Sequence, residues 1–580
     1  MLVAWVERRP FRDRPGQQHP VVFETQVVVQ PAREVFLDAE VEGLRRAGFP
    51  RASRAIAGGL WSLREVALAT IVVKRHAFFE CKLSAMSHAP DDAGSDAVSL
   101  SGHPRGLSTL FFTEMWERFS YYGMRALLVL FMTDLVANGG LGMTDVTATA
   151  IYGLYTFAVY AVALPGGWIA DRLTGQRQAV LIGGVIIAVG HLTLAIPTLS
   201  AFYLGLVLIV LGTGLLKPNV SAIVADLYPE GGARRDAGFS IFYMGINVGG
   251  LAGPLVCGTL GERVNWHLGF SAAGFGMILG VVQYVWGWRH MGDAGLLRNR
   301  DSGDRGRALR SFWWGLGLVV ALVLATTWLQ TAGMWAFSIL DVAQATGAII
   351  AGLVVVYFVY IFMFGRLTLE ERGRVAVIPV LFVAAAVFWS GFEQAGSSMN
   401  LFADRLTDRS VLGFEVPTTW LQSVNPLFII LLAPVVGSLW VRLGSKNPSI
   451  SAKFTYGLLL LGLGFLVLAW GATFATDGTR VSPMWLVVTY FFHTVGELCL
   501  SPVGLSSITK LSPKRLVGQM MGIWFMAAAL GNLLAGLVAG LIESLAVPQL
   551  FGAVGLIVIG GGVVMMLASG SVRRLAGDVR

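Results

Sequence analysis

Four ionisable side chains lie within the first strongly apolar stretch of the chain, and their positions carry the main clue to its chemistry. Glu114, Glu117, Arg118 and Arg125 occur among residues that would otherwise suit a membrane span. A charge at the centre of a lipid-embedded helix costs roughly 2.5 to 3.5 kcal/mol on insertion scales, so such residues normally face a wet interior. At helical spacing, Glu114, Arg118, Tyr122 and Arg125 share one stripe, with Glu117 at its flank. We therefore expect this stripe to line a pathway.

Three further ionisable residues lie deep within later apolar stretches: Lys217, Glu393 and Glu497. The stripe together with Lys217 has a net positive character, whereas Glu393 and Glu497 are acidic. A cavity with two such ends suits a zwitterion, because Arg and Lys pair with a carboxylate and Glu pairs with an ammonium group. A buried carboxylate whose cationic partner moves away can also take up a proton. These residues favour an amino acid or a peptide as substrate, coupled to proton binding.

The composition is that of a polytopic membrane protein. Hydrophobic residues make up 55% of the chain and charged residues 13%, whereas soluble domains hold about 25% charged residues. The net charge of +8 arises from basic residues in short loops between apolar stretches, which argues against a nucleic-acid-binding patch. The three cysteines have no disulfide or metal-binding spacing, and HExxH and GxSxG motifs are absent, so we expect neither a metal cofactor nor an enzyme.

Apolar segments of roughly 20 residues recur after Gly106, each long enough for a hydrocarbon core about 30 Å thick. We expect fourteen spans, near residues 108–137, 147–171, 178–198, 202–226, 237–258, 267–289, 312–331, 341–364, 375–402, 416–441, 454–473, 483–509, 517–541 and 548–571. An even number of spans puts both termini on one side. The loops on that side hold most of the Arg and Lys, so the positive-inside rule predicts that both termini are cytoplasmic.

Three weak internal similarities recur at nearly one offset, which indicates a duplicated architecture. The matching positions are Glu117 with Glu393 (276 apart), Pro218 with Pro502 (284 apart) and Met244 with Met526 (282 apart). They suggest two parallel six-helix halves, an all-α membrane fold that resembles the major facilitator superfamily, with the spans near 312–331 and 341–364 inserted between the halves.

The expected organisation follows from these spans. It comprises an N-terminal extension (1–85), a cytoplasmic leader (86–107), an N-terminal six-helix bundle (108–289), a cytoplasmic linker with two inserted transmembrane helices (290–374), a C-terminal six-helix bundle (375–571) and a cytoplasmic tail (572–580).

Several motifs together resemble those of the proton-dependent oligopeptide transporter (POT) family. The run Glu114-x-x-Glu117-Arg118-Phe119-x-Tyr121-Tyr122-Gly123 is similar to the family's ExxER signature, and Phe242 to Gly249 is similar to its second signature. Further resemblances lie at Leu216-Lys217-Pro218-Asn219, at Phe392 to Ser398 and at Gly496 to Pro502. The resemblance covers residues about 100 to 575, in the family's order, and includes the two extra helices of the bacterial members.

This resemblance implies a proton symporter of di- and tripeptides in a bacterial inner membrane. The implied symporter works by alternating access, with protons as the coupling ion and no other cofactor. The resemblance also implies that Arg125 and Lys217 meet the peptide carboxylate and that Glu497 meets its amino terminus. The other implied binding residues are Asn247, Asn425, Tyr121, Tyr122, Tyr160 and Trp524. The implied proton-coupling residues are Glu114, Glu117, Arg118, Lys217 and Glu393, with Glu393 exchanging partners with Arg125. The implied partners are peptides, protons and lipid, with no nucleic acid, and the protein is expected to be a monomer.

Two alternatives stay open at this point. The net positive first half would also suit a family member that transports nitrate or another small anion, although an anion has no use for Glu497. A peptide sensor without a transport cycle would have the same binding site. His493 and Glu497 are four residues apart, yet no further ligand lies nearby, so we expect His493 to be a packing residue.

The first 85 residues match neither the family nor the rest of the chain, because they are charged, are broken by Pro and Gly and hold no long apolar span. We expect that translation starts near Met86, which begins a short polar leader ahead of the first span. The intact mass of the natively expressed protein checks this expectation, and a mass that includes residues 1–85 would contradict it. The alternative is a translated cytoplasmic extension.

Overall fold

The computed structural model describes residues 2–8, 25–31, 102–297, 302–411, 413–475 and 478–577. The chain divides into two compact units, Met1–Ala97 and Val98–Arg580. In the first unit, strand β1 (Leu2–Arg8) pairs antiparallel with β2 (Thr25–Pro31). The expected start at Met86 lies outside the described residues.

The second unit is helical, and its first half begins with the charged helix. The elements of this half are α4 (Arg105–Thr133), η1 (Val136–Asn138), α5 (Asp145–Ala161), α6 (Ala163–Ile169), η2 (Ala170–Thr174), α7 (Gln176–Leu194), α8 (Leu199–Asp226), α9 (Gly232–Arg263), α10 (Trp266–Gly287) and η3 (Trp288–Met291). Polar caps begin several of them: the side chains of Thr144, Thr198 and Asn265 accept hydrogen bonds from the first turns of α5, α8 and α10.

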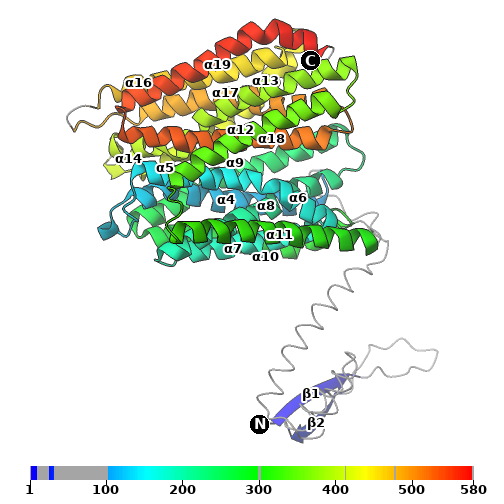
Figure 1. The fold of residues 1–580 in the computed structure, drawn as a ribbon. Coiled ribbons are helices and arrows are strands. Elements are labelled where there is room, and N and C mark those ends of the chain that lie inside the picture. The colour runs from blue at the N-terminus through cyan, green and yellow to red at the C-terminus, as the bar shows by residue number, and fades with distance from the viewer. Residues whose placement is uncertain are drawn as a thin grey trace. The chain divides into compact units, whose positions relative to one another are not determined.

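The second half repeats this plan. Its elements are α13 (Leu369–Phe392), η4 (Glu393–Gly396), α14 (Ser398–Arg405), β3 (Ser410–Val411), β4 (Phe414–Glu415), η5 (Thr418–Ser423), α15 (Val424–Leu443), η6 (Gly444–Lys446), α16 (Ile450–Ala472), α17 (Met484–Leu511), α18 (Val517–Ala539), η7 (Gly540–Glu543) and α19 (Val547–Ala576). Figure 1 shows the helices of the first half, blue to teal, gathered on one side of the unit, with those of the second half, yellow to red, on the other.

Two helices stand between the halves in sequence, α11 (Ser302–Thr331) and α12 (Ile339–Phe364). Helix α12 begins with a capping box between Ser338 and Asp341, and it packs against α18 and α5 through Ala343 and Phe358. Helix α11 contacts η2 but is exposed along nearly all of its described length. Its apolar surface is therefore left to lipid.

The fourteen predicted spans are confirmed. Among the described residues, thirteen helical segments are long and apolar enough to cross a membrane. Helix α4 is the fourteenth span: it has the required length of 29 residues, but its charged residues Glu114, Glu117, Arg118 and Arg125 set it apart from the other thirteen.

The span predicted over 375–402 is not one continuous helix. Helix α13 ends at Phe392, a turn of 3₁₀ helix follows, and α14 begins at Ser398. The break coincides with Gly396 and Ser397, residues that have little preference for a helix interior. Glu393 is the first residue of the 3₁₀ turn, so the interruption sets the position of its carboxylate.

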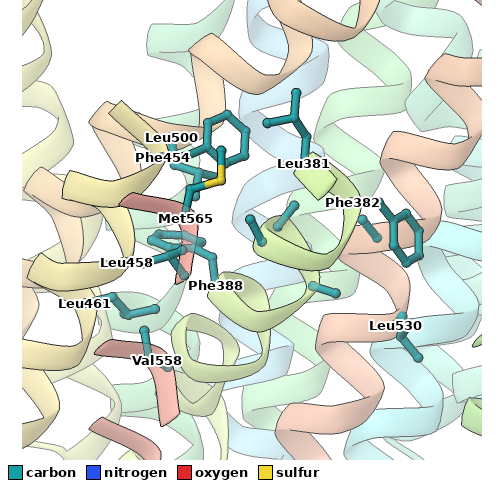
Figure 2. Close-up of a cluster of buried hydrophobic side chains, with 14 of the residues drawn as sticks. Leu381, Phe382, Phe388, Phe454, Leu458, Leu461, Leu500, Leu530, Val558 and Met565 are labelled. Carbon is teal, nitrogen blue, oxygen red and sulfur yellow. The ribbon is translucent and has the colours of Figure 1, made fainter. Parts of the chain in front are cut away.

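Each half has its own apolar core. In the second half, Leu381 and Phe388 of α13 meet Phe454, Leu458 and Leu461 of α16. Figure 2 shows these side chains converging with Leu500, Val558 and Met565 from α17 and α19. The first half has separate clusters, one around Phe131, Phe202 and Phe270 and another around Leu110, Val220 and Tyr284. Apart from Leu401 of α14, which joins the cluster around Phe131, these cores are separate, and this separation allows each half to move as a body.

Two glycines let the halves approach closely along α5 and α18. A Cβ atom added at Gly536 would overlap the backbone of Thr149 and Gly153, and one added at Gly153 would come within 3.0 Å of the Leu533 carbonyl oxygen. Small residues at such crossings permit backbone contact between membrane helices.

We therefore expect Gly536→Val to destabilise the protein by about 1 to 3 kcal/mol, because the added side chain must separate the two helices. The melting temperature of the purified protein in detergent measures this effect. Gly560→Val is the matched control, since Gly560 of α19 has open space around it. Equal melting temperatures for the two variants would contradict the prediction.

Candidate functional site

A cavity of about 240 Å³ lies between the two halves. Helices α4, α5, α8 and α9 line it from the first half, and α13, η4, η5, α15 and α17 line it from the second. Ten of the residues predicted from sequence line this cavity: Glu114, Arg118, Tyr122, Arg125, Tyr160, Lys217, Asn247, Glu393, Asn425 and Glu497. The stripe of α4 supplies the first four of them.

Arg118 lies between two carboxylates at one end of the α4 stripe. Its Nε atom is 2.8 Å from Glu114 Oε1 and 2.7 Å from Glu117 Oε2, and all three side chains are buried. Glu117 does not line the cavity, although it pairs with Arg118, which does. One guanidinium thus serves two carboxylates, which leaves this cluster with one excess negative charge when every group is ionised.

Arg125 forms the ion pair that joins the two halves. Its Nη2 atom is 2.7 Å from Glu393 Oε2, and the two side chains are 6% and 5% exposed. The guanidinium carbon also lies 5.6 Å from the centre of the Tyr122 ring. Because Arg125 belongs to α4 and Glu393 to η4, this pair connects one half to the other within the cavity wall.

Lys217 lies on α8, directly before the helix-interior Pro218. Its ammonium nitrogen is 3.6 Å from the centre of the Tyr160 ring, a cation–π contact. Lys217 forms no ion pair among the described residues. Its positive charge is therefore available to an anionic group in the cavity.

Glu497 and Asn425 form the opposite wall. The Asn425 amide donates to Thr494 Oγ1 at 2.9 Å and to Glu497 Oε2 at 3.5 Å. Glu497 has no cationic partner in the part of the chain that the structure describes. On the facing helix α9, the Asn247 amide donates to the Tyr243 carbonyl oxygen at 3.0 Å.

Two predicted pocket residues lie outside the cavity. Tyr121 is buried behind its wall, where it stacks on Tyr155 at 6.5 Å between ring centres. Trp524 belongs to the apolar core of the second half, and its ring packs edge-on against Phe454 and covers Gly504. In this arrangement α18 directs the Trp524 indole into the core. Its part in a side-chain pocket stays a prediction.

The cavity also includes residues that the sequence did not single out. Among them are Ser221, Tyr243, Gln422, Tyr490 and Trp389. Helical spacing could have indicated two of them, since Tyr243 lies four residues before Asn247 and Gln422 lies three before Asn425. His493, which the sequence analysis expected to be a packing residue, also lines the cavity. The ring of His493 lies 4.8 Å from that of Phe465 and 6.4 Å from that of Phe392, so it packs among aromatic rings although it reaches the wall.

Hydrogen bonds and ion pairs between the halves gather at the end of the bundle where α9 finishes and η5 begins. Glu262 accepts hydrogen bonds from the backbone N–H groups of Thr418 and Thr419, at 2.7 and 2.9 Å. Arg405 forms a bidentate pair with Asp145, at 2.6 and 2.8 Å. These contacts join the two halves at this end of the bundle.

Comparison with known proteins gives consistent matches over most of the chain. A model of the POT family matches residues 177–556. A peptide transporter of Yersinia enterocolitica is 44% identical over 456 residues, which cover 76% of this chain and 89% of that protein. A di-/tripeptide transporter of Lactococcus lactis is 37% identical over 490 residues, which cover 83% of this chain and 98% of that protein.

Solved structures agree with the sequence matches. A crystal structure of a peptide transporter POT in complex with sulfate is 42% identical, covers 83% of this chain and 97% of its own, and superposes with a TM-score of 0.77. The family model covers more than half of the chain, and the relatives are covered almost completely. The chain is therefore a multi-pass membrane transporter that belongs to the POT family.

Proposed function

We propose that this protein carries di- and tripeptides together with protons across the bacterial inner membrane, by alternating access. The observation that carries the proposal is the buried Arg125–Glu393 ion pair, which joins the two halves in the wall of the cavity. The names of relatives, a peptide transporter and a di-/tripeptide transporter, support the substrate class.

The charges of the cavity suit a peptide zwitterion. Arg118 is engaged by Glu114 and Glu117, and Arg125 is engaged by Glu393. Lys217 and Glu497 are left as the charged cavity residues without an ion pair among the described residues, and they belong to opposite halves. A bound peptide would pair its carboxylate with Lys217 and its ammonium group with Glu497, with Asn247 and Asn425 near its main chain. Such a ligand joins the halves.

Proton coupling follows from the same ion pair. Glu393 is ionised while it pairs with Arg125, and protonation removes the attraction between them. Arg125 is then free to meet the peptide carboxylate, and the halves can separate at the end where Glu262 and Arg405 join them. The cluster of Glu114, Glu117 and Arg118 beside Lys217 offers a second place where proton binding can alter the charge that the substrate meets.

The positive-inside pattern supports an orientation with both termini in the cytoplasm. In that orientation, the end joined by Glu262 and Arg405 faces outward, so the arrangement corresponds to an inward-facing state. One chain supplies both walls of the cavity, which supports a monomer as the transporting unit.

Uptake of labelled dialanine into liposomes that hold the purified protein tests the proposal. We expect accumulation under an inward proton gradient, competition by unlabelled tripeptide and no accumulation at matched pH. Binding without uptake would point to a sensor instead, and accumulation of nitrate but not of peptide would point to an anion transporter.

Glu393→Gln should abolish gradient-driven accumulation and leave some peptide counterflow, because a neutral amide keeps the shape of the side chain but cannot exchange a proton. Both activities can be measured in the same liposomes. Glu370→Gln, at an exposed position on α13, is the control. Driven uptake at the wild-type level in Glu393→Gln would show that Glu393 is not the coupling site.

Lys217→Ala should raise the KM for dialanine roughly tenfold to a hundredfold, the range expected when a hydrogen bond to a charged group is lost. Initial rates over a range of peptide concentrations measure the change. Lys446→Ala, an exposed substitution in η6, should leave the KM unchanged. A wild-type KM in Lys217→Ala would remove this residue from the binding site.

A further inference from the structure

The Arg125–Glu393 pair is held by a neighbour that does not line the cavity. Tyr152 of α5 is fully buried, and its hydroxyl donates a hydrogen bond to the backbone carbonyl oxygen of Glu393 at 3.4 Å. The centre of its ring lies 5.8 Å from the guanidinium carbon of Arg125. Tyr152 therefore touches both members of the pair while belonging to neither of their helices.

The 3₁₀ turn that carries Glu393 is shaped to admit this hydroxyl. A Cβ atom at Gly396 would overlap the Tyr152 hydroxyl oxygen, so only a glycine lets the turn come this close to α5. The 3₁₀ turn that follows Phe392 therefore leaves room for the Tyr152 hydroxyl beside Gly396.

A second buried hydrogen bond crosses between the halves on the other side of the pair. The amide of Asn400, on α14, donates to the backbone carbonyl oxygen of Ala126 at 2.9 Å. Ala126 directly follows Arg125 on α4, and Asn400 is 1% exposed. In both contacts, a side chain of one half binds backbone of the other half, at or next to a member of the ion pair.

We propose that Tyr152 and Asn400 are positioning residues that clamp Arg125 against Glu393 and so set the pH at which the pair opens. Tyr152 fixes the backbone of Glu393 to the first half, and Asn400 fixes the backbone beside Arg125 to the second. The inference rests on the proposed symport and assigns these two residues a part in its proton response.

The direction of the effect follows from the ion pair. Without the clamp, Arg125 and Glu393 are held together less firmly, so the pair separates more readily when a proton competes with Arg125 for the carboxylate. Other titratable groups around Glu393 are Tyr121 and Tyr122 of α4, Tyr160 of α5, Lys217 of α8 and Glu497 of α17. Replacing Tyr152 by Phe leaves all of them in place, so the change isolates one hydroxyl.

The test is the pH profile of gradient-driven dialanine uptake by Tyr152→Phe. We expect its midpoint to move upward by up to about one pH unit, the size that a single buried hydrogen bond supports, with little change in the KM for peptide. Asn400→Leu should move the midpoint in the same direction. Tyr155→Phe is the matched control, because Tyr155 is also buried on α5 and its hydroxyl has no hydrogen-bond partner among the described residues.

The same change in a Glu393→Gln background provides a double-mutant test. There, Tyr152→Phe should leave the pH profile of peptide counterflow unaltered, since the titrating carboxylate is gone. The inference is overturned if Tyr152→Phe has the midpoint of wild type, or if it lowers the rate at every pH without moving the midpoint, as a purely structural role would. Failure of the wild-type protein to accumulate peptide would instead count against the proposed symport.

Discussion

The structure depends on one constraint: opposite charges are buried between its two helical halves. A charge within the membrane is costly unless it has a partner, and removing one partner of a buried pair typically costs about 3 to 5 kcal/mol. Arg125 and Glu393 meet this demand across the boundary between the halves. The two halves are therefore held together by an interaction that one proton can weaken, which is what a transporter that must alternate between two states needs.

What the rest of the cavity can bind depends on which of its remaining charged side chains already have an ion-pair partner. Arg118 balances carboxylates of its own helix, which keeps that cluster within the first half. Lys217 and Glu497 stand on opposite walls, and among the described residues neither forms an ion pair, their direct contacts being with Tyr160 and Asn425. A ligand with charges at both ends then completes the pairing, so binding and the relative position of the halves become coupled.

Close backbone contact and local breaks in helices position these charges. Gly153 and Gly536 let α5 and α18 touch, and Gly396 lets the turn at Glu393 reach Tyr152. Each half keeps its own apolar core, around Phe388 in one and Phe270 in the other. The halves can thus move relative to one another without repacking their interiors, while a few small residues determine how near they come.

The sequence alone determined the membrane class, the fourteen spans and the charged residues of the cavity, because a charge in an apolar stretch is visible in one dimension and helical spacing places the α4 stripe on one face. The spacing of residues did not determine which charges pair, and the contact of Glu393 with Arg125 was implied only by the family resemblance. The approach of Tyr152 to Glu393 and the packing of Trp524 against Phe454 depend on contacts between residues more than sixty positions apart. Only the tertiary structure decides such contacts, because local propensity and periodicity carry no information about which distant surfaces meet.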